Sequence, residues 1–104
     1  MKNSPNLPAE SRLVRTLLNG DFAVTAEVTP PASCDPAHLL DKAAPLRGWV
    51  DAVNVTDGAS ARVAMSSLAA AALLARNGIE PVLQFTCRDR NRIALQSDLL
   101  GAAA

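Results

Sequence analysis

Aromatic residues are scarce in this sequence, which has two phenylalanines, one tryptophan and no tyrosine among its 104 residues. Its hydrophobic residues, 49% of the chain, are therefore mostly Ala, Leu and Val, as in helices that pack against a sheet. That content can form a buried core, which excludes wholesale disorder. The length predicts a single domain.

The sequence also has no excess of positive or negative charge and no long apolar run. Ten Lys and Arg residues balance ten Asp and Glu residues, so attraction to a nucleic-acid backbone has no electrostatic support. No apolar run reaches the roughly 20 residues that a membrane-spanning helix needs. Because the polar segment Met1–Glu10 lacks the apolar core of a signal peptide, we expect a cytoplasmic protein with neither nucleic-acid nor membrane partners.

Metal-ligand and nucleotide-binding patterns are missing. Cys34 and Cys87 form no C-x-x-C pair, and free thiols are expected in a reducing cytosol. His38 is the only histidine, so we expect no histidine-based metal site. The segment Thr29-Pro30-Pro31 stands where a Rossmann fingerprint would follow the first strand, and no P-loop is present.

Three β-rich segments, each followed by a helical segment, determine the predicted fold class. They are Phe22–Val28, Val50–Val55 and Val82–Cys87. Their spacing of about thirty residues predicts parallel strands joined by helices, hence an α/β fold. Both the open doubly wound sheet and the closed (β/α)8 TIM barrel use this arrangement.

The helix boundaries carry capping signals. Ser11 is expected to cap a short first helix, and Asp35 followed by proline predicts the start of the second. An Ala-rich helix is expected over Ala61–Arg76, with Ser60 able to cap it. Asp89 is expected to cap a final helix that begins near residue 90.

The end of the chain bears on its organisation. The last helix reaches Gly101–Ala104 without a stop signal, and three βα units cannot close a barrel of eight strands. We therefore expect a leader and short helix over residues 1–20, then about three βα units of an N-terminal barrel portion over residues 21–104. The exposed strand edges would be covered by the remainder of the barrel or in a homo-oligomer. A small three-layer domain is the alternative.

Each predicted strand has one apolar and one polar face, because successive side chains alternate. The polar faces become more polar toward the carboxyl ends of the strands, where both architectures place active sites. A plain barrel interior would carry Val, Ile and Leu instead. The pattern predicts a ligand pocket formed by five side chains, namely Glu27, Asn54, Thr56, Gln84 and Thr86.

Glu27 is the main candidate for a catalytic residue. An unpaired carboxylate is costly to bury, and burial would raise its pKa and suit it to act as a general acid. The alternative is that a Lys or Arg pairs with it. Beyond the second strand, Thr56-Asp57-Gly58-Ala59 could approach a ligand closely or form an ordinary turn. Likewise, Arg88–Asn91 could contact phosphates or form a solvated turn.

Three motifs resemble those of one enzyme family. Ala26–Pro31 resembles the Glu-x-x-Pro-Pro motif that ends the first strand of methylenetetrahydrofolate reductases. Asn54–Ala59 is similar to their second-strand segment, and Gln84–Asn91 is similar to the third. The resemblance extends over about residues 20–104 at the family's spacing.

The resemblance implies a (β/α)8 barrel that binds FAD and uses NAD(P)H to reduce 5,10-methylenetetrahydrofolate to 5-methyltetrahydrofolate, in one-carbon and methionine metabolism. Glu27 matches the family's acid, which protonates the departing nitrogen as the folate ring opens. Thr56, Asp57 and Ala59 match positions that contact the flavin and the nicotinamide or folate. The resemblance therefore implies that Thr56, Asp57, Ala59 and Gln84 bind the cofactor. It also implies that Glu27 and Thr56 bind the folate.

Two positions depart from the family pattern, since tyrosine is common at Asp57 and histidine at Gln84. The branch with this third-strand pattern includes fused and partner-dependent forms, which leaves the electron donor open. Two other functions stay open at the level of sequence. One is a non-enzymatic partial barrel that serves in binding or assembly, and the other is a different barrel enzyme of folate or corrinoid chemistry.

Overall fold

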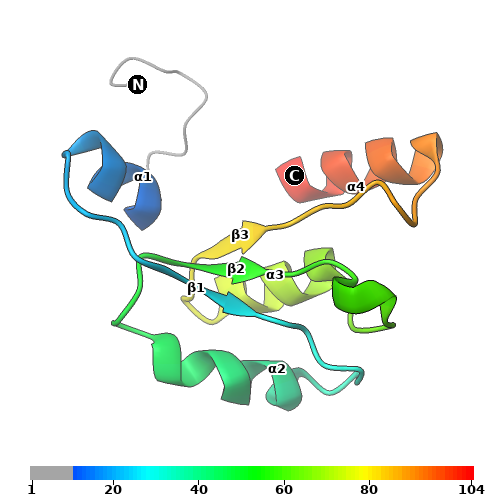
Figure 1. Ribbon diagram of the computed structural model, residues 1–104, viewed down its shortest axis with the longest axis horizontal. Coiled ribbons are helices and arrows are strands. Elements are labelled where there is room, and N and C mark those ends of the chain that lie inside the picture. Colours follow the sequence, from blue (N-terminus) through cyan, green and yellow to red (C-terminus); the bar gives the residue numbers. More distant parts are fainter. Residues whose placement is uncertain (1–10) are drawn as a thin grey trace.

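A computed structural model describes residues 11–104, so the predicted leader lies outside the described residues. Three parallel strands form one sheet in the order β1-β2-β3 (Figure 1). They are β1 (Thr25–Val28), β2 (Ala52–Val55) and β3 (Pro81–Leu83). The α/β fold with a parallel sheet is confirmed, and it is consistent with part of a βα barrel.

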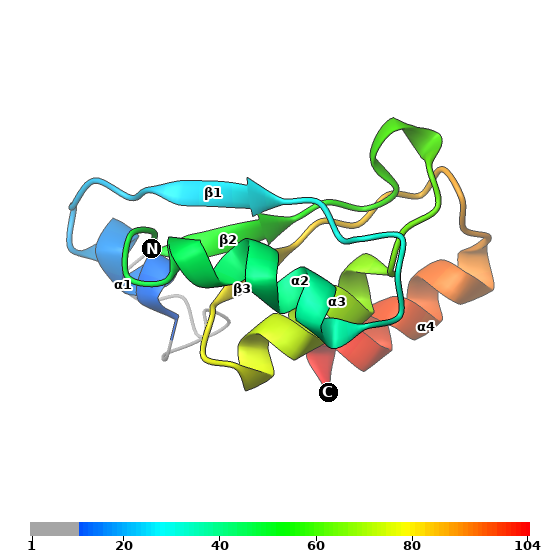
Figure 2. The same ribbon diagram turned by 90° about the horizontal axis from the view of Figure 1, so that it is seen from below.

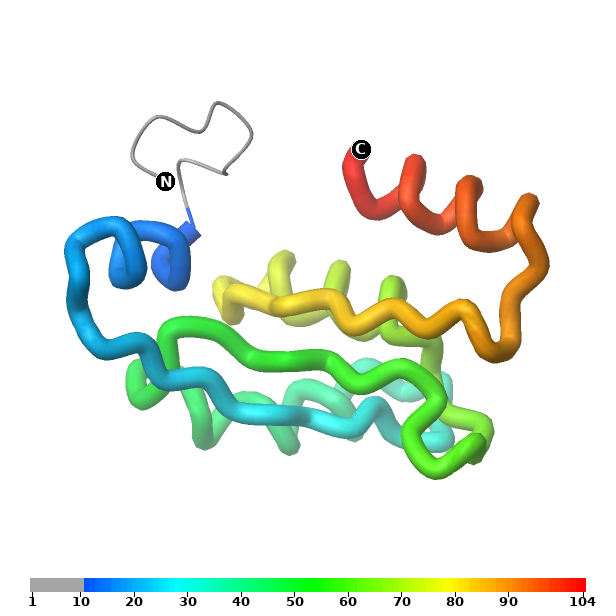
Figure 3. The backbone as a smooth tube through the Cα atoms, turned by 45° about the horizontal axis from the view of Figure 1, so that its top comes forward, coloured from blue at the N-terminus to red at the C-terminus, as the bar shows by residue number. Residues whose placement is uncertain are grey.

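Four α-helices and two 3-10 turns accompany the strands in the described residues. Figure 2 shows α2, α3 and α4 on one side of the sheet. In Figure 3 the opposite face of the sheet turns toward the viewer, with none of the described helices in front of it. The elements are α1 (Arg12–Leu18), α2 (Pro36–Ala43), η1 (Ala44–Leu46), η2 (Ala59–Ala61), α3 (Ser67–Arg76) and α4 (Arg92–Ala103).

The core lies between the sheet and helices α2 and α3. Small and aliphatic side chains fill it, as the scarcity of aromatic residues requires, and burial of their apolar area stabilises the fold. Leu39 of α2 and Leu74 of α3 are fully buried against the strands. The other buried members are Val28, Ala43, Val53, Val55, Ala70, Ala71 and Ile79.

Two carboxylates hold α1 at the amino ends of the strands. The Glu80 carboxylate accepts hydrogen bonds from the Ser11 hydroxyl, from Arg12 N at 2.7 Å and from Leu13 N at 3.3 Å. Asp51 accepts from Arg12 Nε at 3.2 Å and from Val24 N at 2.9 Å. The Val24 hydrogen bond is the main cause that holds the pKa of Asp51 below 3.8. Because Asp51 precedes β2 and Glu80 precedes β3, α1 is tied to both strands.

The strands are shorter than predicted, because a strand extends only where a partner pairs with it. The predicted segment Phe22–Val28 pairs with β2 from Thr25 onward, and Phe22 is 90% exposed. The predicted segment Val82–Cys87 loses its partner beyond Val55 of β2, although the backbone N–H of Gln84 still donates to that residue's carbonyl at 3.2 Å.

Two of the predicted helix starts are wrong. The Ala-rich helix begins at Ser67 rather than Ala61, and its cap is Ser66, whose hydroxyl accepts from Ala69 N at 3.2 Å. The preceding residues cannot join the helix, because Ser60 and Ala61 have φ of 58° and 55°, outside the helical region. The predicted caps Ser11 and Asp35 are confirmed.

The final helix also starts later than expected. Asn91 caps α4 by accepting a hydrogen bond from Ala94 N at 2.9 Å, and Asp89, the predicted cap, is instead paired with Arg88 at 2.8 Å. An adjacent arginine thus competes successfully for the carboxylate. None of the helices within residues 11–104 is long and apolar enough to cross a membrane.

Candidate active site at the carboxyl ends of the strands

The face of the sheet that lacks helices carries the predicted polar side chains. Glu27 of β1 is the register partner of Asn54 of β2, so both project from this face. The Asn54 amide donates to Thr25 Oγ1 across the strands at 3.1 Å. Val53 and Val55 on the opposite face are fully buried, so the predicted apolar face is confirmed for β2, whereas Phe22 and Val24 of the first predicted strand are exposed.

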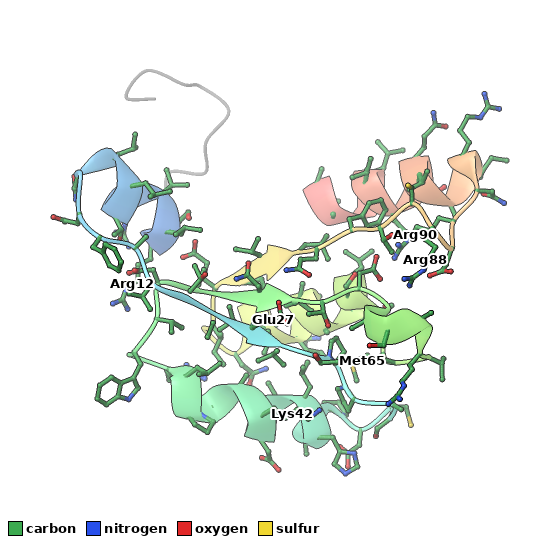
Figure 4. The ribbon with its side chains drawn as sticks, viewed as in Figure 1. Arg12, Glu27, Lys42, Met65, Arg88 and Arg90 are labelled. Atoms are coloured by element: carbon green, nitrogen blue, oxygen red, sulfur yellow. The ribbon has the colours of Figure 1, made fainter. Side chains whose placement is uncertain are left out.

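Glu27 is exposed, so the burial considered for its carboxyl group is not observed in the described chain. The cause is the arrangement of layers, because the polar face has no covering helix within residues 11–104 (Figure 4). The proposed alternative, a Lys or Arg paired with Glu27, does not occur among the described residues either. The carboxylate therefore has a free approach from the open side of the sheet.

A cavity of about 320 Å³ lies where β1 and β2 end. Thr29, Pro30 and Pro31 of the first motif line it together with Thr56 and Ala59 of the second. Lys42 of α2 closes one side and donates to the Thr29 carbonyl at 3.3 Å. The cavity unites the first two motifs, whereas the other predicted pocket residues, Glu27, Asn54, Gln84 and Thr86, lie outside its lining.

Thr56 has an unusual position at this cavity. The residue is 7% exposed, and among the described residues its hydroxyl oxygen is buried without a hydrogen-bond partner. A buried hydroxyl that lacks a partner carries a desolvation cost of about 1–3 kcal/mol. Because the oxygen atom is itself buried, a ligand could complete its hydrogen bonding only if the residues that cover it moved.

Asp57 is bound within the protein rather than presented to solvent. Its carboxylate pairs with Arg90 at 2.5 Å and accepts from Thr86 N at 2.8 Å. The hydrogen bond from Arg90 is the main cause that keeps the pKa of Asp57 below 3.8. The loops after β2 and β3 are thereby joined.

Arg88 makes a second connection between these loops. Its guanidinium donates to the Gly58 carbonyl at 2.7 Å and to Asp89 at 2.8 Å. Gly58 has φ of 62°, and a Cβ atom at this position would lie 2.6 Å from Arg88 Nη2. The predicted solvated turn is confirmed at Arg88 and Asp89, which form an exposed turn. The hydrogen bonds of Arg88 and Arg90 within the protein were not predicted.

Sequence reasoning missed the role of Arg90. The signal was present, since Asp57 and Arg90 carry opposite charges in segments that follow adjacent parallel strands. Carboxyl ends of adjacent parallel strands meet at one edge, which brings such segments together. Neither charge could be assigned a partner without knowing the path of each loop.

Comparison with protein families decides the identity of this arrangement. The model of the family described as methylenetetrahydrofolate reductase matches residues 12–104. The chain belongs to the methylenetetrahydrofolate reductase family. No curated protein and no solved structure gives a significant match.

Membership of the methylenetetrahydrofolate reductase family associates the chain with oxidoreductases of folate metabolism. The matched region contains β1, β2 and β3 and the segments that follow them. The three motifs noted in the sequence all fall at or next to the carboxyl ends of these strands. The resemblance inferred from the motifs is therefore confirmed at the level of the family.

Replacing Gly58 by Ala is expected to disturb this end of the sheet more than a glycine substitution elsewhere. The new Cβ atom would meet the Arg88 guanidinium in addition to the left-handed backbone strain of about 1–2 kcal/mol. Gly48→Ala is the matched control, since Gly48 has φ of 83° with open space around it. Urea unfolding should show the larger loss for Gly58→Ala, and equal losses would contradict the close contact.

Acid is expected to weaken the connection between the two loops. Because the folded-state pKa of Asp57 lies below 3.8, its ion pair stabilises the fold above that pH, and the stabilisation is lost as pH falls through the lower folded value. Urea unfolding measured above and below pH 3.8 should show a shallower pH dependence for Asp57→Asn than for the wild type. Asp41→Asn, an exposed site outside the described hydrogen bonds, should retain the wild-type dependence.

Proposed function

We propose that this protein takes part in the flavin-dependent reduction of 5,10-methylenetetrahydrofolate to 5-methyltetrahydrofolate with NAD(P)H as the electron donor. The observation that carries the proposal is the family match over residues 12–104. The open polar face that bears Glu27 supports it, since a substrate needs access to the proposed acid.

FAD is the cofactor that the family implies, and the residues present are compatible with it. A flavin ring is flat and has a polar edge, so it needs hydrogen-bonding groups beside apolar surface. Gln84 offers an amide on the open face, whereas the Thr56 hydroxyl, which lacks a partner, would first have to be uncovered. Ala59 is small enough to permit close approach. Asp57 departs from the pattern, because its carboxylate is already paired with Arg90.

The chain's own contribution to the reaction is acid catalysis and substrate binding. FAD, when bound, supplies the hydride. Glu27 donates a proton to the nitrogen that departs as the folate ring opens, and Thr56 hydrogen-bonds the folate beside it. A positioned carboxyl group is well suited to this proton transfer. Bound cofactor and substrate would exclude water from the open face, which strengthens the electrostatic interactions around the reacting atoms.

The proposal is tested by the visible absorbance spectrum of the purified whole protein, followed by assay of NAD(P)H oxidation with 5,10-methylenetetrahydrofolate. A flavin band that bleaches with NAD(P)H and recovers with the folate is the expected result. A flavin that is reduced but not reoxidised by the folate would point to another barrel enzyme. A protein that neither binds added FAD nor turns over would contradict the proposal.

A binding or assembly role is the second candidate, and the two outer strands favour it. β1 and β3 each pair on one side only among the described residues, and unpaired edges can recruit another strand. Size-exclusion chromatography of the 104-residue chain is the test. Self-association would support this role, whereas a monomer that unfolds cooperatively would remove the reason for it.

A further inference from the structure

We propose that Arg90 is a positioning residue for the cofactor site, holding the segment after β2 in the shape in which Thr56, Asp57 and Ala59 meet a ligand. The proposal rests on the proposed function for the identity of that ligand. Its structural part, that Arg90 determines the conformation of residues 57–61, stands on the contacts of this chain alone.

Arg90 uses its whole guanidinium group in contacts with three segments. Nη1 donates to Asp57 Oδ2 at 2.5 Å and to the Thr86 carbonyl at 2.6 Å, and Nη2 donates to Asp57 Oδ1 at 3.3 Å. Nε donates to Asp98 of α4 at 3.1 Å. The group also stacks on Phe85, with 4.2 Å between Cζ and the ring centroid. The planar fork of arginine suits such a bidentate, stacked position, and lysine cannot reproduce it.

This cluster is shielded from water more than surface ion pairs are. The Arg90 and Asp57 side chains are 13% and 11% exposed, whereas the neighbouring pair of Arg88 and Asp89 is 47% and 63% exposed. Exposed pairs contribute little to structure, because solvent screens them. Arg90 is therefore the main residue that holds the loops after β2 and β3 together. Arg88 contributes through its hydrogen bond to the Gly58 carbonyl.

The segment that follows Asp57 needs outside support. Gly58, Ser60 and Ala61 all have positive φ, between 55° and 62°. For Ser60 and Ala61 this conformation is unfavourable and persists only where the surroundings hold it. Arg90 holds the start of the segment at Asp57, and Met65 N holds its far end by donating to the Pro31 carbonyl at 2.8 Å. Figure 4 shows Arg88 and Arg90 at the same end of the sheet as η2.

Arg90 also compensates the charge of Asp57. Without it, an unpaired carboxylate would lie at the position where the bound flavin is expected. A nearby negative charge disfavours the added electrons of a reduced flavin, because like charges repel. Loss of Arg90 should therefore lower the flavin midpoint potential, and removal of the Asp57 charge as well should restore it.

The first test examines the conformation of the loop in the cofactor-free whole protein. The N–H groups of Ala61 and Arg62 donate to the carbonyls of Gly58 and Ala59 at 2.9 and 3.3 Å. Amide hydrogen exchange at Ala61 and Arg62 should accelerate about tenfold in Arg90→Gln, with little change at Val53 in the core. Arg90→Lys should give only partial protection, because it keeps the charge but not the fork. Arg92→Gln is the control, since Arg92 is exposed and makes none of the described hydrogen bonds. Unchanged exchange in Arg90→Gln, or equal acceleration in the control, would overturn the proposal.

The second test uses FAD as the probe. Arg90→Gln should bind FAD about tenfold more weakly and lower its midpoint potential, and Asp57→Asn combined with Arg90→Gln should restore the potential without restoring loop protection. A midpoint potential that is the same in the wild type, in Arg90→Gln and in the double variant would contradict the proposal that Arg90 compensates the charge of Asp57. If the wild-type protein binds no FAD, the proposed function fails, while the exchange experiment still decides whether Arg90 holds the loop.

Discussion

Glu27→Gln in the whole protein is expected to abolish reduction of 5,10-methylenetetrahydrofolate while leaving reduction of the flavin by NAD(P)H intact. The amide keeps the size and the hydrogen bonding of the side chain but cannot donate the proton that the departing nitrogen requires. Positioned acids of this kind contribute about 100- to 10,000-fold to a rate. The two half-reactions should be measured separately, each by flavin absorbance in a stopped-flow instrument.

The separation of the half-reactions makes this experiment decisive for Glu27. Asp41→Asn on α2 removes a carboxylate that is exposed and lies outside the described hydrogen bonds, so both half-reactions should keep their wild-type rates. Equal loss of both half-reactions in Glu27→Gln would indicate damage to cofactor binding. Loss of neither would show that another group protonates the folate.

Leu74→Ala is expected to lower the free energy of unfolding by about 2–5 kcal/mol, the range for deletion of a buried leucine side chain. Leu74 is 0% exposed and packs in the core between α3 and the sheet. Few large side chains are available in this core to fill the cavity that would remain. The change should be measured by urea unfolding followed by far-UV circular dichroism.

Leu100→Ala is the matched control for this experiment. Leu100 lies in α4, and its side chain is 75% exposed. The same chemical change there should alter the free energy of unfolding by less than about 0.5 kcal/mol. A similar loss at both positions would mean that α4 is covered in the protein under study, and that would support the assembly role.

The element types could be predicted from the sequence because local signals and tertiary packing agree in most of the chain. Asp35 followed by Pro36 starts α2 as predicted, and Asn77-Gly78 ends α3. The valines of β2 alternate with small and polar residues, which correctly gave the buried face of the sheet. Each of these features depends on neighbours within a few residues in the sequence.

The errors occur where a distant residue decides the conformation. Ala61 has a high helix propensity, yet it lies in η2 with φ of 55°, in a loop whose far end is held by the hydrogen bond from Met65 N to the Pro31 carbonyl. The carboxylate of Asp57 looked free for a ligand, yet Arg90, 33 residues later, occupies it. The burial of Glu27 depends on what covers the sheet, a property that the alternation of side chains along one strand cannot report.

The hydrogen bonds that hold α1 stabilise the amino ends of the strands, whereas the candidate site lies at their carboxyl ends. Glu80 and Asp51 fix the amino ends of β2 and β3 through α1, and they make no described contact with the loops at the opposite ends. A substitution in those loops can therefore change what the protein binds without loosening the anchor. The strands can thus tolerate sequence changes in the loops at their carboxyl ends, because α1 holds their amino ends in place. Proteins with this fold could therefore differ in ligand preference while keeping the same α1 contacts at the amino ends of the strands.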